Sequence, residues 1–155
     1  MRMNRIVLVA LAIPLAAGAA FAQLKPPAAS TELNTSLAAN PEKEAEGRLA
    51  AQGWLVLLDR KDWGRAWETT ASAFRGKVAL GSWMDAIPKV RDPLGTLVER
   101  VPYETAFKTT LQGQPAGEYV TVVFQTKFSN RQVAEVVTTT RDTDGKWRVT
   151  GYKAE

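Results

Sequence analysis

The stretch from residue 118 to residue 152 constrains the fold most, because it alternates apolar and polar residues around two tight turns. Such alternation is typical of strands that bury one face. The turns are Ser129-Asn130 and Asp142–Gly145, and Gly145 suits the left-handed position that closes the second turn. The three antiparallel strands predicted on either side of these turns are Glu118–Phe128, Arg131–Arg141 and Trp147–Tyr152.

The same turns predict which residues face one another across the sheet. The first turn places Phe124 opposite Glu135, on the more apolar face of its strand. The second turn places Val137 opposite Gly151, which brings Lys153 opposite Glu135 if the last strand continues that far. A carboxylate among apolar side chains is costly to bury without a partner. We therefore expect Glu135 either to pair with a cation or to lie at an open, solvated end of the sheet.

Residues 1–22 have the three parts of a secretory signal peptide. Arg2 and Arg5 give a positive start, and Ile6–Ala17 is a short apolar core. Ala20-Phe21-Ala22 is a small-x-small cleavage site before Gln23. The core is too short for a stable membrane anchor, and an uncleaved anchor is the alternative interpretation. No cysteine follows the core, which excludes a lipid anchor there. The sequence predicts an exported protein, periplasmic or secreted, with no membrane span after cleavage.

Residues 23–40 differ in composition from the rest of the chain. They are rich in Ala, Ser, Thr and Pro and carry one Lys and one Glu, which predicts a disordered linker. The residues after them show no internal repeat, and their number suits one core. Residues 41–155 are therefore expected to form a single domain.

Composition excludes several classes of site. The chain has no His and no Cys, which removes histidine bases, cysteine nucleophiles, disulfides and ordinary zinc sites. The formal net charge of +4 falls to +2 when Arg2 and Arg5 leave with the signal peptide. Without a basic cluster, that charge gives no case for nucleic acid as a partner. We expect no cofactor and no metal.

Helices are expected ahead of the sheet. Asn40 is a good N-cap and begins a helix that runs to about Arg60. Asp62 caps a second helix, whose apolar face continues to Phe74, and Ser82 caps a third. The tryptophans on these helices lie on apolar faces, so we expect them in the core rather than in a stacking site.

One more strand is expected between the helices and the central stretch. It covers Thr96–Val101, resumes over Tyr103–Leu111, and is bent by Pro102. Pairing through a short loop places Tyr103 opposite Thr126 on the inner face. Helices followed by an antiparallel meander predict an α+β fold.

Residues that carry a family resemblance are spread over nearly the whole domain. They are Trp54-Leu55, Asp59, Trp67, Trp83, Arg91-x-Pro93-Leu94-Gly95, Glu118-Tyr119 and Asp144-Gly145-Lys146-Trp147-Arg148-Val149-x-Gly151-Tyr152. On these motifs the chain resembles domain-of-unknown-function family 4019 from about Glu44 to Lys153. The resemblance implies a cystatin-like or nuclear-transport-factor-2-like cone, in which N-terminal helices pack on a curved antiparallel sheet. The family has no established activity, so the resemblance implies no catalytic residue.

Polar residues at the predicted inner face are the candidates for a binding site. The resemblance implies that the open end of that face is a pocket. The candidate pocket-lining residues, four from the strands and two from the rim, are Tyr103, Thr126, Glu135, Lys153, Arg91 and Arg100. An arginine at a helix end usually caps the helix, so a structural role for Arg91 is the alternative.

Two functions of different classes are consistent with these residues. The first is a non-catalytic binding or accessory domain of the bacterial cell envelope, for an unknown small molecule or envelope protein. The second is a small pocket enzyme of the isomerase or dehydratase kind, with Glu135 as base and Tyr103 as hydrogen-bond donor. A carboxylate that works as a base needs a dry site and a raised pKa. A Glu135 held in a salt bridge would therefore favour binding over catalysis.

Overall fold

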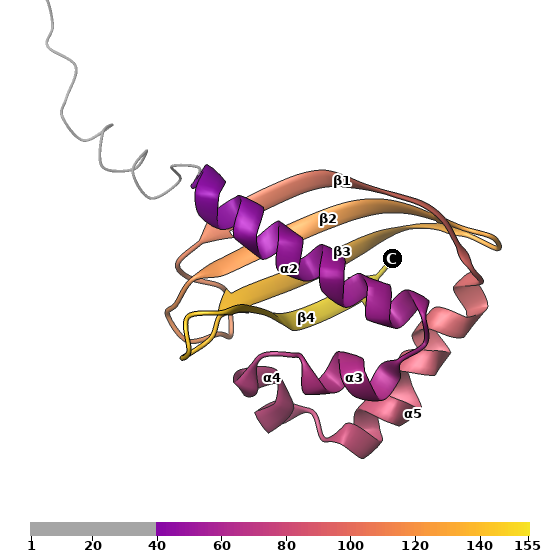
Figure 1. Cartoon of the computed structure of the whole chain (residues 1–155), viewed down its shortest axis with the longest axis horizontal. Coiled ribbons are helices and arrows are strands. Elements are labelled where there is room, and N and C mark those ends of the chain that lie inside the picture. Colours follow the sequence, from indigo (N-terminus) through magenta and orange to yellow (C-terminus); the bar gives the residue numbers. More distant parts are fainter. Residues whose placement is uncertain (1–39) are drawn as a thin grey trace, which may run out of the picture.

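The computed structural model describes residues 40–155, so the predicted signal peptide of residues 1–22 and the linker up to residue 39 lie outside the described residues. The described elements, in chain order, are the helices α2 (Pro41–Asp59), α3 (Trp63–Glu68), α4 (Ser72–Lys77) and α5 (Leu80–Arg91), a 3-10 turn η1 (Asp92–Leu94), and the strands β1 (Leu97–Lys108), β2 (Tyr119–Phe128), β3 (Gln132–Arg141) and β4 (Trp147–Ala154) (Figure 1).

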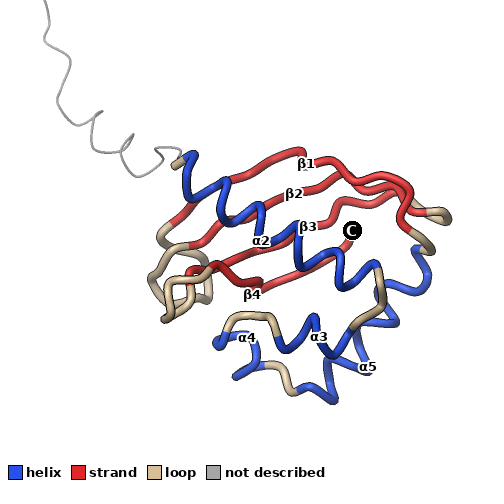
Figure 2. Tube along the Cα trace, viewed as in Figure 1, coloured by secondary structure: helices blue, strands red, loops and turns tan. Residues whose placement is uncertain are grey.

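The four strands form one antiparallel sheet in the order β1-β2-β3-β4. Helix α2 lies across one face of the sheet and contacts every strand, while α3, α4 and α5 gather beyond β4 (Figure 2). The predicted α+β class is therefore confirmed, with the helices first and the meander after them. No helix within residues 40–155 is long and apolar enough to cross a bilayer.

The helix starts agree with the predicted capping only in part. Asn40 caps α2 by accepting a hydrogen bond from the Lys43 amide at 3.1 Å, and Asp62 caps α3 in the same way. The predicted second helix is instead split into α3 and α4. Helix α3 ends at Glu68, and Ala71, the extended N-cap of α4, donates its N–H to Val149 O on the edge of β4 at 2.8 Å. The prediction for Ser82 is wrong by a few residues, because α5 begins at Leu80.

The core lies between α2 and the inner face of the sheet. Trp54, Leu55 and Leu58 of α2 are buried in one cluster with Val122 and Phe124 of β2. The indole N–H of Trp54, which burial removes from water, donates to Ala66 O at 2.8 Å. The predicted core role is confirmed for Trp54 and Trp83, while Trp63 and Trp67 are partly buried against the core.

The register of the central hairpins is confirmed up to one point in β4. Phe124 faces Glu135 and Gly145 has a φ of 78°, as predicted. Beyond Val149 the pairing shifts by one residue, so that Gly151 faces Thr138 and Ala154 faces Glu135. Such a β-bulge inserts an extra residue and reverses which face the following side chains occupy.

The bulge overturns the predicted position of Lys153. That lysine does not face Glu135 but lies on the outer side, with its side chain 59% exposed and paired with Glu155 at 2.8 Å. Tyr152 takes the inward position instead, opposite Val137. The predicted Glu135–Lys153 pair is therefore wrong.

A second irregularity overturns the predicted position of Tyr103. Next to the connecting loop Phe107 faces Val120, two residues from the predicted register. The pairing shifts again between Pro102 and Glu104, so that Arg100 faces Thr126 where Tyr103 was expected. Tyr103 is 70% exposed. Since proline cannot donate to the ladder, a bulge beside it is a common solution on an edge strand.

Candidate functional site

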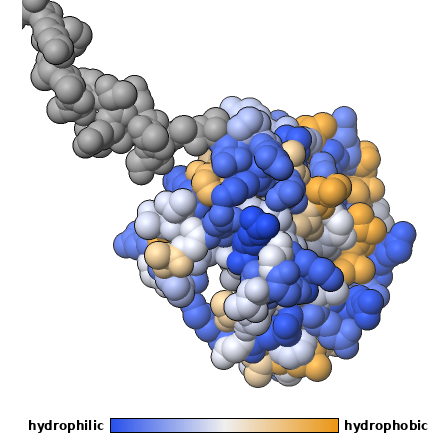
Figure 3. Space-filling view, turned by 60° about the vertical axis from the view of Figure 1, so that its left-hand side comes forward, coloured by the Kyte–Doolittle hydropathy of each residue, from blue (hydrophilic) through white to orange (hydrophobic). Residues whose placement is uncertain are grey.

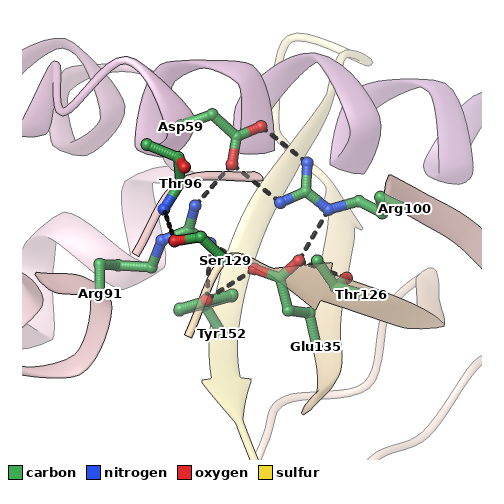
Figure 4. A network of polar contacts seen from close by, with 8 residues as sticks. All are labelled: Asp59, Arg91, Thr96, Arg100, Thr126, Ser129, Glu135 and Tyr152. Carbon is green, nitrogen blue, oxygen red and sulfur yellow. Dashed lines mark hydrogen bonds and ion pairs between the residues drawn. The ribbon is translucent and has the colours of Figure 1, made fainter. Parts of the chain in front are cut away.

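Glu135 lies at the centre of a buried ion network that joins two helix ends to the sheet (Figure 4). Its carboxylate on β3 is fully buried and pairs with the guanidinium groups of Arg91 and Arg100. Arg91 is the last residue of α5, and Arg100 reaches in from β1. Asp59, the last residue of α2, pairs with both arginines from the other side.

Every acceptor position of Glu135 is occupied. Oε1 accepts hydrogen bonds from Arg91 and from the Tyr152 hydroxyl, the latter at 2.8 Å. Oε2 accepts from Arg100 Nε at 2.7 Å and from the Thr126 hydroxyl at 2.6 Å. A carboxylate offers about four acceptor positions, so a substrate would find none of them free.

Asp59 completes the network by binding Arg100 with two parallel bonds. Arg100 Nη1 lies 2.7 Å from Asp59 Oδ2, and its Nη2 lies 2.8 Å from Oδ1. Arg91 Nη2 shares Oδ1 at 2.5 Å. Fork-to-fork geometry of this kind fixes orientation as well as energy. The aromatic ring of Phe128 covers the arginines, with Arg91 Cζ 4.8 Å from its centroid.

The charges of the network hold one another ionised. Burial by itself would raise the pKa of Asp59, but its bonds to Arg100 and Arg91 outweigh burial and keep that pKa below the ordinary 3.8. Burial opposes the charge on each arginine. Tyr152, Glu135 and Asp59 nevertheless raise the pKa of Arg91 above its ordinary value, and Asp59 and Glu135 do the same for Arg100. Burial and the charge of Glu135 raise the pKa of Tyr152, so its phenol stays protonated and donates.

This arrangement is suited to holding structure rather than to proton transfer. In residues 40–155 every buried side-chain nitrogen and oxygen has a hydrogen-bond partner. A base must present a free lone pair to its substrate, and Glu135 presents none. Because two carboxylates face two guanidiniums, the charges of the network cancel, which is the condition under which buried ions are tolerated.

The structure brings together four of the six candidate residues. Glu135, Arg91, Arg100 and Thr126 meet in the network, whereas Lys153 and Tyr103 lie outside it. The network also contains Asp59 and Tyr152, which the candidate set lacked. The signal for Asp59 was a charged residue directly after the apolar run of residues 54–58. Tyr152 gave no inner-face signal, because the bulge reverses its side.

A second site, absent from the sequence interpretation, is an open cavity of about 340 Å³ between α2, the end of α3 and β4, which we call the hollow. Its walls are mostly aliphatic and aromatic. The lining residues are Ala50, Gly53, Trp54, Leu57, Thr69, Lys146, Trp147, Arg148 and Val149. The face of the molecule that Figure 3 shows is mainly hydrophilic, with apolar residues gathered toward its right-hand side.

The polar groups of the hollow differ in how firmly they are held. Trp147 donates its indole N–H to Glu46 at 2.7 Å, and Arg148 binds Asp144 through two bonds of 2.7 Å. Lys146 Nζ makes no ion pair within the described residues. The hollow therefore combines an indole held by a hydrogen bond to α2 with a cation that makes no ion pair within the described residues.

No group of three or more potential metal-ligating His, Cys, Asp or Glu residues occurs in residues 40–155. The two carboxylates of the turn beside the hollow are already engaged. Asp142 accepts from the Ser72 amide and hydroxyl at 3.0 and 2.7 Å, and Asp144 binds Arg148. The chemistry available in the hollow is therefore that of apolar contact and cationic attraction.

Comparison with known proteins gives a family and no function. A family model described as "Protein of unknown function (DUF4019)" matches residues 50–152. Neither a curated protein nor a solved structure matches the chain. The matched range includes the hollow and all residues of the ion network.

Proposed function

The chain belongs to the family described as "Protein of unknown function (DUF4019)", and from its geometry we propose that it is an exported, non-catalytic binding domain of the bacterial cell envelope. Its small-molecule ligand occupies the hollow. The observation that carries the proposal is the hollow itself, about 340 Å³ with aromatic and aliphatic walls. Ligand sites are typically concave, mostly apolar cavities of about 300–1,000 Å³ with a few polar groups that orient the ligand.

The alternative of an isomerase or dehydratase has less support. Its two residues differ in environment: Glu135 is fully buried with every acceptor position filled, and Tyr103 is 70% exposed on β1. Proton abstraction requires base and donor to converge on one substrate. The ion network and the hollow involve different side chains, so a ligand in the hollow meets no base from the network.

The finer fold assignment belongs to the same proposal. Helix α2 packed on one face of an antiparallel meander is the arrangement expected of a cystatin-like or nuclear-transport-factor-2-like cone. In such a cone a cavity between helix and sheet is a natural place for a ligand. The hollow lies in that position, bounded by α2 on one side and β4 on the other.

Export is tested by the intact mass of the protein that the cell accumulates. The signal-peptide pattern predicts a mature chain beginning at Gln23. A mass that retains residues 1–22 would end the export proposal.

Ligand binding is tested by native mass spectrometry of protein purified from the envelope fraction. We expect the native mass to exceed the denatured mass by that of one small molecule, which denaturation releases. The variant Trp147→Ala removes one wall of the hollow, so it should no longer show the extra mass. Equal native and denatured masses in the unmodified protein would contradict the proposal.

A further inference from the structure

We infer that the ligand of the hollow is a small organic anion with a flat apolar body, of which an aromatic carboxylate is the simplest form; this inference rests on the proposed function. Three features of the hollow support it: the charges of its lining, the hydrogen-bonded indole of Trp147, and the free backbone edge of β4.

The lining contains two cations and no carboxylate. Lys146 and Arg148 both contribute to it, and no Asp or Glu does. Arg148 is neutralised by Asp144 and Asp142, which leaves Lys146 as the cation without an ion-pair partner among the described residues. Lys146 is exposed and its charge also acts on the carboxylate of Asp144, but it makes no ion-pair contact of its own. An ammonium in this position beside an apolar cavity favours an anionic ligand over a cationic one.

The indole of Trp147 provides a flat wall that is already in place. Its N–H donates to the exposed Glu46 of α2 at 2.7 Å, which favours one orientation of the ring before a ligand arrives. Trp54 also borders the hollow, but its side chain is buried in the core, so the flat wall is that of Trp147. Flat ligands gain most from such walls, since stacking maximises the contact of one ring with another.

Helix α2 keeps the space above these walls open at Gly53. A Cβ added there would meet nothing within 4 Å, so packing does not require glycine at this position. Gly47, earlier in the same helix, is different: a Cβ there would lie 2.7 Å from Val120 Cγ2. Glycine weakens a helix interior. At Gly53 the absence of a side chain leaves room in the hollow.

The edge of β4 adds backbone donors for an acidic group. Asp142 N donates to Lys146 O at 2.8 Å, which makes these two residues a hydrogen-bonded pair of the ladder. In an antiparallel ladder the next residue, Trp147, therefore directs its N–H and C=O away from β3. Val149 has the same parity, and its carbonyl does accept a bond from outside the sheet, from Ala71. The N–H of Trp147 is thus placed beside Lys146 as a second donor for a carboxylate.

The test compares naphthoate with naphthamide, which has nearly the same shape and no charge. Two-dimensional NMR spectra of the isotope-labelled protein, in the form that the cell accumulates, would follow the Trp147 indole N–H and the amides of the hollow. We expect naphthoate to shift these signals with a dissociation constant up to about fivefold below that of naphthamide, as one partly exposed charge contact provides.

Two lysine variants identify the cation. Lys146→Gln should abolish most of the preference for naphthoate, and Lys153→Gln, on the outer side of β4, should leave it unchanged. Equal binding of both probes, or an unchanged preference in Lys146→Gln, would overturn the anionic ligand class while leaving the hollow as a binding site. Failure of both probes to shift any signal of the hollow would overturn the inference together with the proposed function.

Discussion

Helix α2 contributes to two sites, one filled by paired charges and the other an open cavity. At its C-terminal end Asp59 enters an ion network in which Glu135 is fully buried and every acceptor of that carboxylate is used. Along its middle, Gly53 borders a cavity of about 340 Å³ whose cation, Lys146, has no ion-pair partner in the described part of the chain. We refer to the ion network as the closed site and to the hollow as the open site.

The difference shows how one layer of helix over sheet can separate stability from binding. Buried charges are tolerated only when each has its partner, and removal of one partner leaves an uncompensated charge. The closed site therefore resists change and is unsuited to exchanging ligands. The open site has open space and an exposed cation that makes no ion pair within the described residues, so it can accept a ligand without loss of a structural contact.

Removal of Glu135 should give the largest loss of stability. Glu135→Ala strands Arg91 and Arg100 in a buried position, so we expect the free energy of unfolding to fall by roughly 3–5 kcal/mol. Urea denaturation measures it. In the double variant with Arg100→Ala, the two effects should be less than additive, because the second change removes a charge that the first left unpaired.

Two results would contradict the claim that the paired charges of the closed site stabilise the fold together. One is additive effects of Glu135→Ala and Arg100→Ala. The other is a fall in the free energy of unfolding of no more than about 0.5 kcal/mol for Glu135→Ala.

Acid should weaken the closed site next. The pKa of Asp59 is lower in the folded protein than its ordinary 3.8, so the folded state binds fewer protons there than the unfolded chain. The contribution of Asp59 is therefore complete above the ordinary value and lost as the pH falls through the folded pKa. Urea midpoints across this range should drop, and Asp59→Asn should show a shallower drop. If the urea midpoint of Asp59→Asn depended on pH as steeply as that of the unmodified protein, Asp59 would not be the source of the acid sensitivity.

Two glycines of α2 should respond to alanine with opposite signs. Gly47→Ala forces a methyl group against Val120 and Thr139, which we expect to cost about 1–3 kcal/mol. Gly53→Ala adds a methyl group in open space and removes a helix-weakening residue, so a gain of up to about 1 kcal/mol is expected. Thermal melts of the two variants decide it, and a loss in both would show that the helix at Gly53 is packed.

The smallest effect is expected at Lys153. Its side chain is exposed and pairs only with Glu155, so Lys153→Ala should change the free energy of unfolding by no more than about 0.5 kcal/mol. A double variant with Glu135→Ala should be additive. Non-additive effects would indicate that Lys153 and Glu135 interact, which would contradict the outward position that the bulge in β4 gives Lys153.

Local rules predicted the parts of the fold that they control. The turn at residues 129–130 set the pairing of Phe124 with Glu135, and the side chain of Asn40 identified the start of α2. These features depend on residues close together in the chain. The buried state of Glu135 and its pairing with arginine also agree with the physical cost of burying a carboxylate.

The two bulges could not be predicted in the same way. One extra residue in β4 reverses the side of Tyr152 and Lys153, and too few residues follow it for an alternating pattern to show the change. The irregularity beside Pro102 in β1 moved Arg100 inward and Tyr103 outward by the same mechanism. The hollow left still less signal, because a cavity is defined by side chains that are missing, such as that of Gly53.

The most direct test of the separation between the two sites is native mass spectrometry of Gly53→Leu. Gly53 borders the hollow and a Cβ there meets nothing within 4 Å, so we expect a leucine side chain to occupy part of the hollow. Gly81→Leu is the matched control, since its Cβ also meets nothing within 4 Å and it lies on α5. We predict that Gly53→Leu loses the bound small molecule while its melting temperature does not fall, and that Gly81→Leu retains the molecule. A Gly53→Leu protein that keeps its ligand would contradict the account.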